Sequence, residues 1–297
     1  MNKKIIDGKK IALKVTSEIK DKIEIMSKGQ NIVPGLAVIL IGENPASISY
    51  VKGKEKACKD VGIFTQTFNL DDSSSYDEVS KLIISLNKDD RFHGILLQLP
   101  LPQHLDSDKL INLINPKKDV DGLTSENAGL LLLGKPRFVP ATPLGIQKIL
   151  LEENIKIEGS KILIIGRSNL VGLPLSILLL QRGKGGNATV TIAHTRTKNI
   201  EQLSLNADIV IVASGKPNTL SGKMVSKNSI VIDVGISRLS DQTRKTGYRL
   251  IGDVNFDEVI NIASKVTPVP GGVGPMTIAM LLNNVYLAAT FSQKRPF

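Results

Sequence analysis

Short apolar runs alternate with amphipathic segments along the first half of the chain. The runs Gly35–Ile41 and Gly94–Leu99 are almost wholly apolar and are followed by glycine or proline, which is typical of strands buried on both faces. Apolar residues recur every four positions in Lys9–Met26, which predicts an amphipathic helix. The predicted helices of this half are Lys9–Met26, Ala46–Val61, Tyr76–Asn87 and Asp106–Ile114, and the predicted strands are Gly35–Ile41, Ile63–Phe68 and Gly94–Leu99.

A second series of the same kind follows Thr142–Glu153, which the pattern predicts to be a connecting helix. The run Ile162–Ile165 predicts a buried strand, and the turn Gly166–Asn169 leads into a predicted helix. This helix, Leu170–Gln181, tolerates Pro174 because the N–H groups of a first turn have no intrahelical partner. The remaining predicted elements are strands over Ala188–Ala193, Ala207–Ala213 and Ile230–Val234, a hairpin over Arg238–Asp253 and a last helix over Met276–Phe291.

The two series predict an α/β protein of two domains, the second of them Rossmann-like. The boundary lies near the helix that begins at Thr142, which gives a first domain over residues 1–141 and a second over residues 142–275. We expect the active site in a cleft between these domains, a common place for ligand sites.

The turn that follows Ile162–Ile165 has the composition of a phosphate-binding loop. Free N–H groups and the positive end of the helix dipole make a helix N-terminus an anion site. The match to the G-x-G-x-x-G pattern is imperfect, because Ser168 replaces the second glycine and Gly172 comes one residue late. The loop therefore indicates dinucleotide binding only together with a second signal.

The strand Ala188–Ala193 supplies that signal. It ends where an NAD site usually places an acidic residue for the ribose hydroxyls, and here Thr195 and Arg196 stand instead. A second arginine, Arg167, comes from the preceding turn. Two guanidiniums and a hydroxyl suit a 2′-phosphate, so the predicted cofactor is NADP.

Three polar positions in the first half could take part in chemistry. Tyr50 and Lys54 are four residues apart and share a face of the predicted helix Ala46–Val61. Lys54 is either one of several surface lysines or, at a cleft, a group that transfers a proton. Gln98 is the one polar residue of Gly94–Leu99 and is either a core amide or a ligand contact at the carboxyl end of a strand.

Two carboxylates, Asp119 and Asp121, lie in an irregular loop that begins with a proline. They are either turn caps or acceptors for the N–H groups of a ligand. No metal site is predicted, because metal-ligand spacing is absent from the three histidines, His93, His104 and His194.

Composition narrows the classes of partner. The formal net charge is +10, yet lysines are scattered, aromatic residues make up 4% and tryptophan is absent, which favours small polyanionic ligands over nucleic acid. The single cysteine, Cys58, excludes an internal disulfide and suits a reducing compartment, so we expect a cytoplasmic protein. Neither a run of eighteen apolar residues nor a secretory signal occurs, so no membrane association is expected.

Seven motifs occur in one order along nearly the whole chain. They are Tyr50-Val-Lys-Gly-Lys54, Gln98-Leu-Pro-Leu-Pro102, Asp119-Val-Asp-Gly122, Pro140-Ala-Thr-Pro143, Gly166-Arg-Ser168, Asp233-Val-Gly235 and Pro268-Val-Pro-Gly-Gly-Val-Gly-Pro-Met-Thr277. With them, the chain resembles the bifunctional methylenetetrahydrofolate dehydrogenase/methenyltetrahydrofolate cyclohydrolase family.

The resemblance implies a role for each matching residue. Lys54 is implied to be the catalytic lysine, Tyr50 to position the folate ring, Gln98 to tune the lysine and Asp121 to accept hydrogen bonds from the pterin. The implied NADP contacts are Gly166, Arg167, Ser168, Thr195 and Ile236, and the implied folate-loop contacts are Gly272, Pro275 and Thr277. The last helix, residues 276–291, is expected to complete the first domain, and a homodimer is implied.

The implied function is oxidation of 5,10-methylenetetrahydrofolate with NADP⁺ to the 5,10-methenyl form, then hydrolysis to 10-formyltetrahydrofolate. The folate substrate, often polyglutamylated, would account for the basic charge. Two alternatives remain open. One is another two-domain NADP oxidoreductase that resembles shikimate dehydrogenase, and the other is a non-catalytic NADP-binding or RNA-binding protein.

Overall fold

The computed structural model describes residues 3–244 and 247–292, and the chain divides into two compact units. One unit comprises Leu13–Ala141 and the described residues from Ile278 onward. The other comprises Thr142–Thr277 and the described residues up to Ala12. Parallel sheets form the centre of both units, which confirms the predicted two-domain α/β fold.

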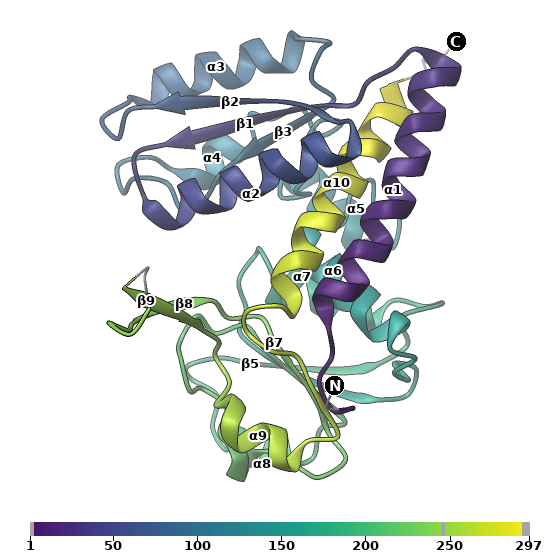
Figure 1. Ribbon diagram of the computed structural model, residues 1–297, viewed down its shortest axis with the longest axis vertical. Coiled ribbons are helices and arrows are strands. Elements are labelled where there is room, and N and C mark those ends of the chain that lie inside the picture. The colour runs from purple at the N-terminus through teal and green to yellow at the C-terminus, as the bar shows by residue number, and fades with distance from the viewer. Residues whose placement is uncertain (1–2, 245–246, 293–297) are drawn as a thin grey trace. The chain divides into compact units, whose positions relative to one another are not determined.

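The unit around Leu13–Ala141 contains a three-stranded parallel sheet in the order β2-β1-β3 (Figure 1). Its strands are β1 (Gly35–Ile41), β2 (Phe64–Leu70) and β3 (Gly94–Leu97). Every residue of β1 and β3 is buried, as their apolar runs predict for parallel strands. The helices of this unit are most of α1 (Gly8–Gln30), α2 (Pro45–Val61), α3 (Tyr76–Lys88), α4 (Ser107–Ile111), α5 (Ser125–Leu132) and the described part of α10 (Val273–Ser292) from Ile278 on.

Helix α2 is fixed at both ends by its own sequence. The Asn44 side chain accepts hydrogen bonds from Ala46 N and Ser47 N, and Pro45 occupies the first turn. Gly62 ends the helix in the left-handed conformation, with φ of 85°. These caps define where α2 begins and ends, and its buried residues are Ser47, Val51, Cys58 and Val61.

The other unit has a five-stranded parallel sheet in the order β10-β7-β6-β4-β5. The chain runs from β4 to β5 on one side and continues with β6 and β7 on the other, so the strand order reverses at β4. Ligands of open α/β sheets bind beyond the carboxyl ends of the strands at such a reversal. The strands are β4 (Lys161–Ile165), β5 (Thr189–Ala193), β6 (Ile209–Val212), β7 (Ile230–Asp233) and β10 (Lys265–Val266).

The helices of this unit include two that the sequence pattern did not predict. These are α8 (Ile200–Leu205) and α9 (Phe256–Ile262), which have six and seven residues. The predicted ones are α6 (Ala141–Glu152), which begins at the division between the units, and α7 (Gly172–Leu180), and a short 3₁₀ helix spans Gly222–Met224. The predicted hairpin is β8 (Ser237–Ser240) paired with β9 (Tyr248–Ile251), and its residues 245–246 lie outside the described residues.

The start of the chain differs from the predicted domain bounds. Ile5 forms a bridge with Val266, and the Ile6 N–H donates to Val266 O at 2.9 Å. Because these bonds join it to the edge strand β10, the segment up to Ala12 groups with the five-stranded sheet rather than with residues 13–141.

Helix α10 is long and apolar enough to cross a bilayer by length and composition. However, 56% of its most apolar window is buried inside the structure. Burial of this extent is typical of a core helix, and within its unit α10 carries the buried residues Leu281, Leu282 and Val285.

Candidate active site

Lys54 and Gln98 are joined by a hydrogen bond. Lys54 Nζ on α2 donates to Gln98 Oε1 at 2.9 Å. Gln98 directly follows β3, where its N–H continues the ladder by donating to Ile39 O at 2.9 Å. Its Nε2 donates to Leu99 O at 2.6 Å, so the amide is oriented with its oxygen toward the lysine. Gln98 is thus a hydrogen-bonded amide at the carboxyl end of a strand, the position at which such sheets bind ligands.

The surroundings of Lys54 favour its neutral amine. Desolvation lowers the pKa of Lys54, and the nearby charge of Asp121 opposes this shift with a smaller effect. Burial also raises the pKa of Asp121, although Lys54 opposes that shift. A lysine whose proton is loosely held can take up and release a proton during a reaction.

Asp119 and Asp121 have different environments. Asp119 is 1% exposed, and its Oδ2 accepts hydrogen bonds from Thr124 N and Asn127 Nδ2, both at 2.8 Å. This carboxylate therefore builds the loop and caps the start of α5. In the described part of the chain no hydrogen bond engages the Asp121 carboxylate, which leaves its oxygens for a ligand.

Tyr50 lies one turn before Lys54 on α2 and is 40% exposed. The spacing of four residues places both side chains on one face of the helix, as predicted. An exposed aromatic ring beside Lys54 offers a flat apolar surface to a ligand.

The loop after β4 brings backbone atoms unusually close together. Gly166 has φ of 127°, and a Cβ on it would stand 2.1 Å from Ala213 O. A Cβ on Gly172, the first residue of α7, would stand 2.1 Å from Gly166 O. Both positions thus require glycine. Despite the irregular spacing of the glycines, the strand, the turn and the helix form a tight unit, the kind of unit whose helix N-terminus binds phosphate in other proteins.

The two predicted arginine positions follow neighbouring strands. Arg167 and Ser168 are exposed in the loop after β4, and Ser168 Oγ accepts from Val171 N at 3.2 Å. Thr195 and Arg196 are exposed in the turn after β5, where Arg196 N donates to His194 Nδ1 at 3.1 Å. Because β4 and β5 pair in parallel, both turns lie at the same edge of the sheet.

Ile236 follows β7 and lies next to the glycine-rich loop before α10. A Cβ on Gly274 would stand 3.4 Å from Ile236 Cδ1, which is ordinary contact. In this loop a Cβ on Gly272 would stand 2.6 Å from Pro268 O. Thr277, within α10, shares a hydrogen bond of 3.0 Å with Thr142. Pro275 lies in the first turn of α10. Ile236, Gly272, Pro275 and Thr277 therefore belong to one unit, whereas Tyr50, Lys54, Gln98 and Asp121 belong to the other.

Two buried carboxylates that the sequence analysis did not single out organise the loops at the ends of β6 and β7. Asp233 accepts from the N–H groups of Gly235, Asp253 and Val254 at 2.9–3.0 Å. Asp253 Oδ2 accepts from Ser214 N, Ser214 Oγ and Gly215 N at 2.7–3.0 Å. The two residues are 20 positions apart, so no local pattern could reveal that Asp233 holds the backbone of Asp253.

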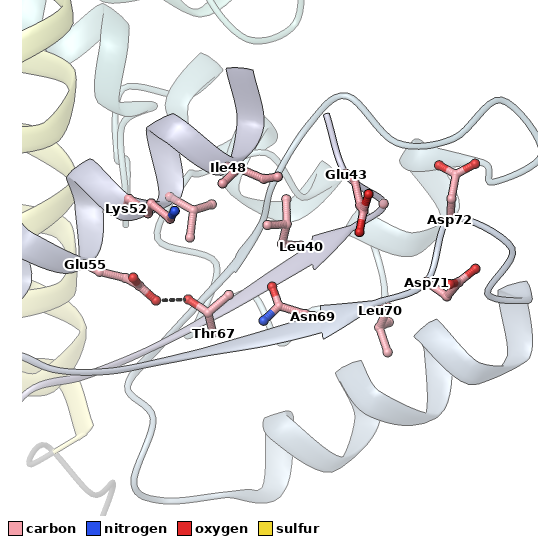
Figure 2. A pocket seen from close by; sticks show the side chains of 12 residues that line it. Leu40, Glu43, Ile48, Lys52, Glu55, Thr67, Asn69, Leu70, Asp71 and Asp72 are labelled. Atoms are coloured by element: carbon pink, nitrogen blue, oxygen red, sulfur yellow. Dashed lines mark hydrogen bonds between the residues drawn. The ribbon is translucent and has the colours of Figure 1, made fainter. Parts of the chain in front are cut away.

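A cavity of about 840 Å³ lies between α2 and strands β1 and β2 (Figure 2). Glu55 and Thr67 form a hydrogen bond of 2.5 Å in its wall. Neither Lys54 nor Gln98 lines this cavity, so it is separate from the site described above. In residues 3–244 and 247–292, no group of three His, Cys, Asp or Glu side chains could hold a metal ion.

Known proteins match the chain over almost its whole length. A family model described as "Tetrahydrofolate dehydrogenase/cyclohydrolase, catalytic domain" matches residues 6–121, and one described as "Tetrahydrofolate dehydrogenase/cyclohydrolase, NAD(P)-binding domain" matches residues 140–293. The "Bifunctional protein FolD" of Acetivibrio thermocellus is 45% identical over 294 residues, which is 99% of each chain.

Solved structures agree with these matches. A crystal structure of the bifunctional methylenetetrahydrofolate dehydrogenase/cyclohydrolase FolD from Campylobacter jejuni is 45% identical, with a TM-score of 0.90 and coverage of 97% of this chain and 99% of that one. The enzyme from Trypanosoma brucei, complexed with NADP cofactor and an inhibitor, is 33% identical, with a TM-score of 0.93 and coverage of 98% of both chains.

The Asp233 carboxylate predicts a pH dependence of stability. Burial raises its pKa to about 6, although the three backbone N–H groups oppose the shift, and Asp253 is the charged group that acts on it. In the unfolded chain the carboxyl loses its proton near pH 4, so between pH 4 and 6 unfolding releases a proton. The contribution of Asp233 to the free energy of unfolding should therefore fall as the pH rises through this window, by roughly 3 kcal/mol.

Denaturant titrations at several pH values on the wild type and on Asp233→Asn measure this contribution. The variant should be less stable overall, because the amide N–H₂ group would face backbone N–H donors. Its free energy of unfolding should not show the fall between about pH 4 and 6 that Asp233 causes in the wild type. Parallel pH profiles for the two proteins would contradict the prediction.

Proposed function

Because the chain belongs to the tetrahydrofolate dehydrogenase/cyclohydrolase family, we propose that Lys54, Gln98 and Asp121 form the site at which its two reactions take place. The protein is a bifunctional, NADP-dependent methylenetetrahydrofolate dehydrogenase and methenyltetrahydrofolate cyclohydrolase. The observation that carries the proposal is the 2.9 Å hydrogen bond from the desolvated Lys54 amine to Gln98. The family match also decides against the shikimate dehydrogenase-like and non-catalytic alternatives.

The residues of the second unit are suited to NADP. The close approaches at Gly166 and Gly172 keep the space above the α7 N-terminus free of side chains, as a pyrophosphate requires. The part of NADP that carries the 2′-phosphate would be held by Arg167, Ser168 and Thr195. Ile236, which follows β7, would also contact the cofactor. When bound, NADP⁺ supplies the hydride acceptor for the oxidation.

In the oxidation, the protein positions the folate. We propose that Tyr50 lies along the folate ring and that Asp121 accepts hydrogen bonds from the pterin. Gly272, directly before α10, and Pro275 and Thr277, at the start of α10, would be further folate contacts. This step needs the donor carbon held in line and little acid–base help.

The hydrolysis needs proton transfer. A water oxygen bonds to the methenyl carbon and one C–N bond breaks; of the two water protons, one passes to the leaving nitrogen and the other is released to solvent. Because desolvation lowers its pKa, the Lys54 amine is suited to accept a proton from the water and deliver it to the nitrogen. Gln98 Oε1 would hold the amine in place through both protonation states, because it accepts from either an amine or an ammonium group.

The wider setting completes the proposal. We propose that the unit of Leu13–Ala141 and the described residues from Ile278 onward is the folate domain, and that the unit of Thr142–Thr277 is the NADP domain. We also propose a homodimer in the cytoplasm, with small-molecule ligands rather than nucleic acid or a membrane as partners. Light scattering on the purified protein tests the dimer.

Lys54→Met tests the proton-transfer role, because methionine keeps the length of the side chain but carries no proton. Cyclohydrolase activity should fall at least about a hundredfold, the scale of a positioned base. Dehydrogenase activity should remain measurable, so methenyltetrahydrofolate accumulates when the protein is mixed with methylenetetrahydrofolate and NADP⁺. The exposed neighbour Lys56 provides the control variant Lys56→Met, which should change neither activity. Equal losses of both activities in Lys54→Met would show that the lysine acts in substrate binding.

Asp121→Ala tests the pterin contact. Both activities should weaken by tens of fold, about 2 kcal/mol, because both depend on the same folate pose. The matched change Asp119→Ala removes the acceptor of Thr124 N and Asn127 Nδ2, so its main effect should be on thermal stability. If Asp119→Ala raised the KM for folate more than Asp121→Ala, the two assignments would have to be exchanged.

Arg167→Ala tests the cofactor preference. The wild type should prefer NADP over NAD by at least about tenfold in kcat/KM, or about 1.4 kcal/mol. The variant should lose most of this preference through weaker use of NADP, with little change for NAD. Kinetics with both cofactors measure the effect, and equal use of NAD and NADP by the wild type would refute the assignment.

A further inference from the structure

Asn284 is a fully buried amide in the apolar helix α10. It is 1% exposed, and its neighbours Leu282 and Val285 are buried as well. Its Nδ2 donates to Val120 O at 2.8 Å and to Val139 O at 2.9 Å. An amide in such surroundings is costly unless its hydrogen bonds are made, and here only one end is engaged. Asn284 Oδ1 is buried without a hydrogen-bond partner in the described part of the chain.

The two carbonyl groups belong to segments that already touch. Val120 lies between Asp119 and Asp121, and Val139 precedes Pro140. A Cβ on Gly122 would stand 3.1 Å from Phe138 O, so the loop and the 138–140 segment are in close contact. Asn284 therefore joins both segments to α10 through one amide group.

The backbone of Asp121 is thus held on two sides. Toward the chain start, the buried Asp119 carboxylate binds Thr124 and Asn127. Toward α10, Val120 O accepts from Asn284, one peptide unit before Asp121. The Asp121 side chain then stands where its charge acts on Lys54.

The same helix also contacts α2 beside Lys54. A Cβ on Gly53 would stand 3.8 Å from Ile278 Cδ1, which is van der Waals distance. Ile278 and Asn284 are six residues apart on α10. Helix α10 therefore passes close to the residue before Lys54 and binds the backbone of the residue before Asp121.

We propose that Asn284 is a positioning residue, which fixes the backbone at Val120 so that Asp121 presents its carboxylate to the folate. The proposal rests on the proposed role of Asp121 as the pterin acceptor. The amide also satisfies two buried carbonyl oxygens, so its loss should lower stability as well, and the folate KM is the measurement that separates positioning from stability. The two donors are useful because the carbonyl groups they bind belong to the site.

Asn284→Leu removes both donors and keeps the volume. The KM for methylenetetrahydrofolate should rise about tenfold or more, whereas the KM for NADP⁺ should stay unchanged. The matched control is Asn283→Leu, the same substitution at the preceding, half-buried position of the same helix, which should leave both constants unchanged. Should Asn284→Leu fail to fold, Asn284→Ser, which keeps one donor, should fold and show an intermediate rise in the KM for folate.

A double variant separates positioning from stability. In the Asp121→Ala background, Asn284→Leu should change the folate KM less than about threefold, because the group that it positions is already absent. If the increases in folate KM caused by the two substitutions multiplied fully in the double variant, the proposal would be overturned. A loss of thermal stability with an unchanged folate KM in Asn284→Leu would also overturn it. An unchanged folate KM in Asp121→Ala would overturn the proposed role of Asp121 itself, and this inference with it.

Discussion

The desolvation of one lysine amine is the constraint on which the catalytic unit depends. Water would keep Lys54 charged, and a charged lysine is a poor base. Burial of the Lys54 side chain lowers its pKa, and the neutral amide oxygen Gln98 Oε1 accepts a hydrogen bond from the amine. Gln98 directly follows β3, which ends at Leu97. The hydrogen bond from Gln98 Nε2 to Leu99 O orients the amide so that its oxygen faces the lysine.

In the unit with the five-stranded sheet, the corresponding requirement is that backbone N–H groups at a helix N-terminus stay accessible to an anionic ligand. Glycines at 166 and 172 allow the strand, the turn and the helix to approach within distances that any side chain would prevent. The carboxylates of Asp233 and Asp253 then hold the loops after β6 and β7 by accepting their N–H groups. Charge inside this unit is therefore used to shape loops, whereas in the catalytic unit it tunes a reacting group.

Much of this could be predicted from local patterns, and the failures have physical reasons. Buried parallel strands and capped helices such as α2 are specified by residues close in sequence. Helices α8 and α9 are too short to show a clear period, and α5 depends on the Thr124 cap and on Asp119. The sequence left Asp119 and Asp121 with the same two interpretations, because only the partners of Asp119, five and eight residues on, distinguish the carboxylates. The pairing of Ile5 with Val266 is wholly non-local.

In the proposed site, two reactions with different needs would use one folate pose, and this accounts for where the polar groups are buried. Oxidation requires rigidity of the bound substrate, and hydrolysis requires one group that can change its protonation state. A rigid group should be held through its backbone, as Asp121 is through the carbonyl of Val120. A group that changes charge should be held by a neutral partner that tolerates both states, as Lys54 is by Gln98. The buried polar contacts of this unit follow that division, which links its packing directly to the chemistry of the family.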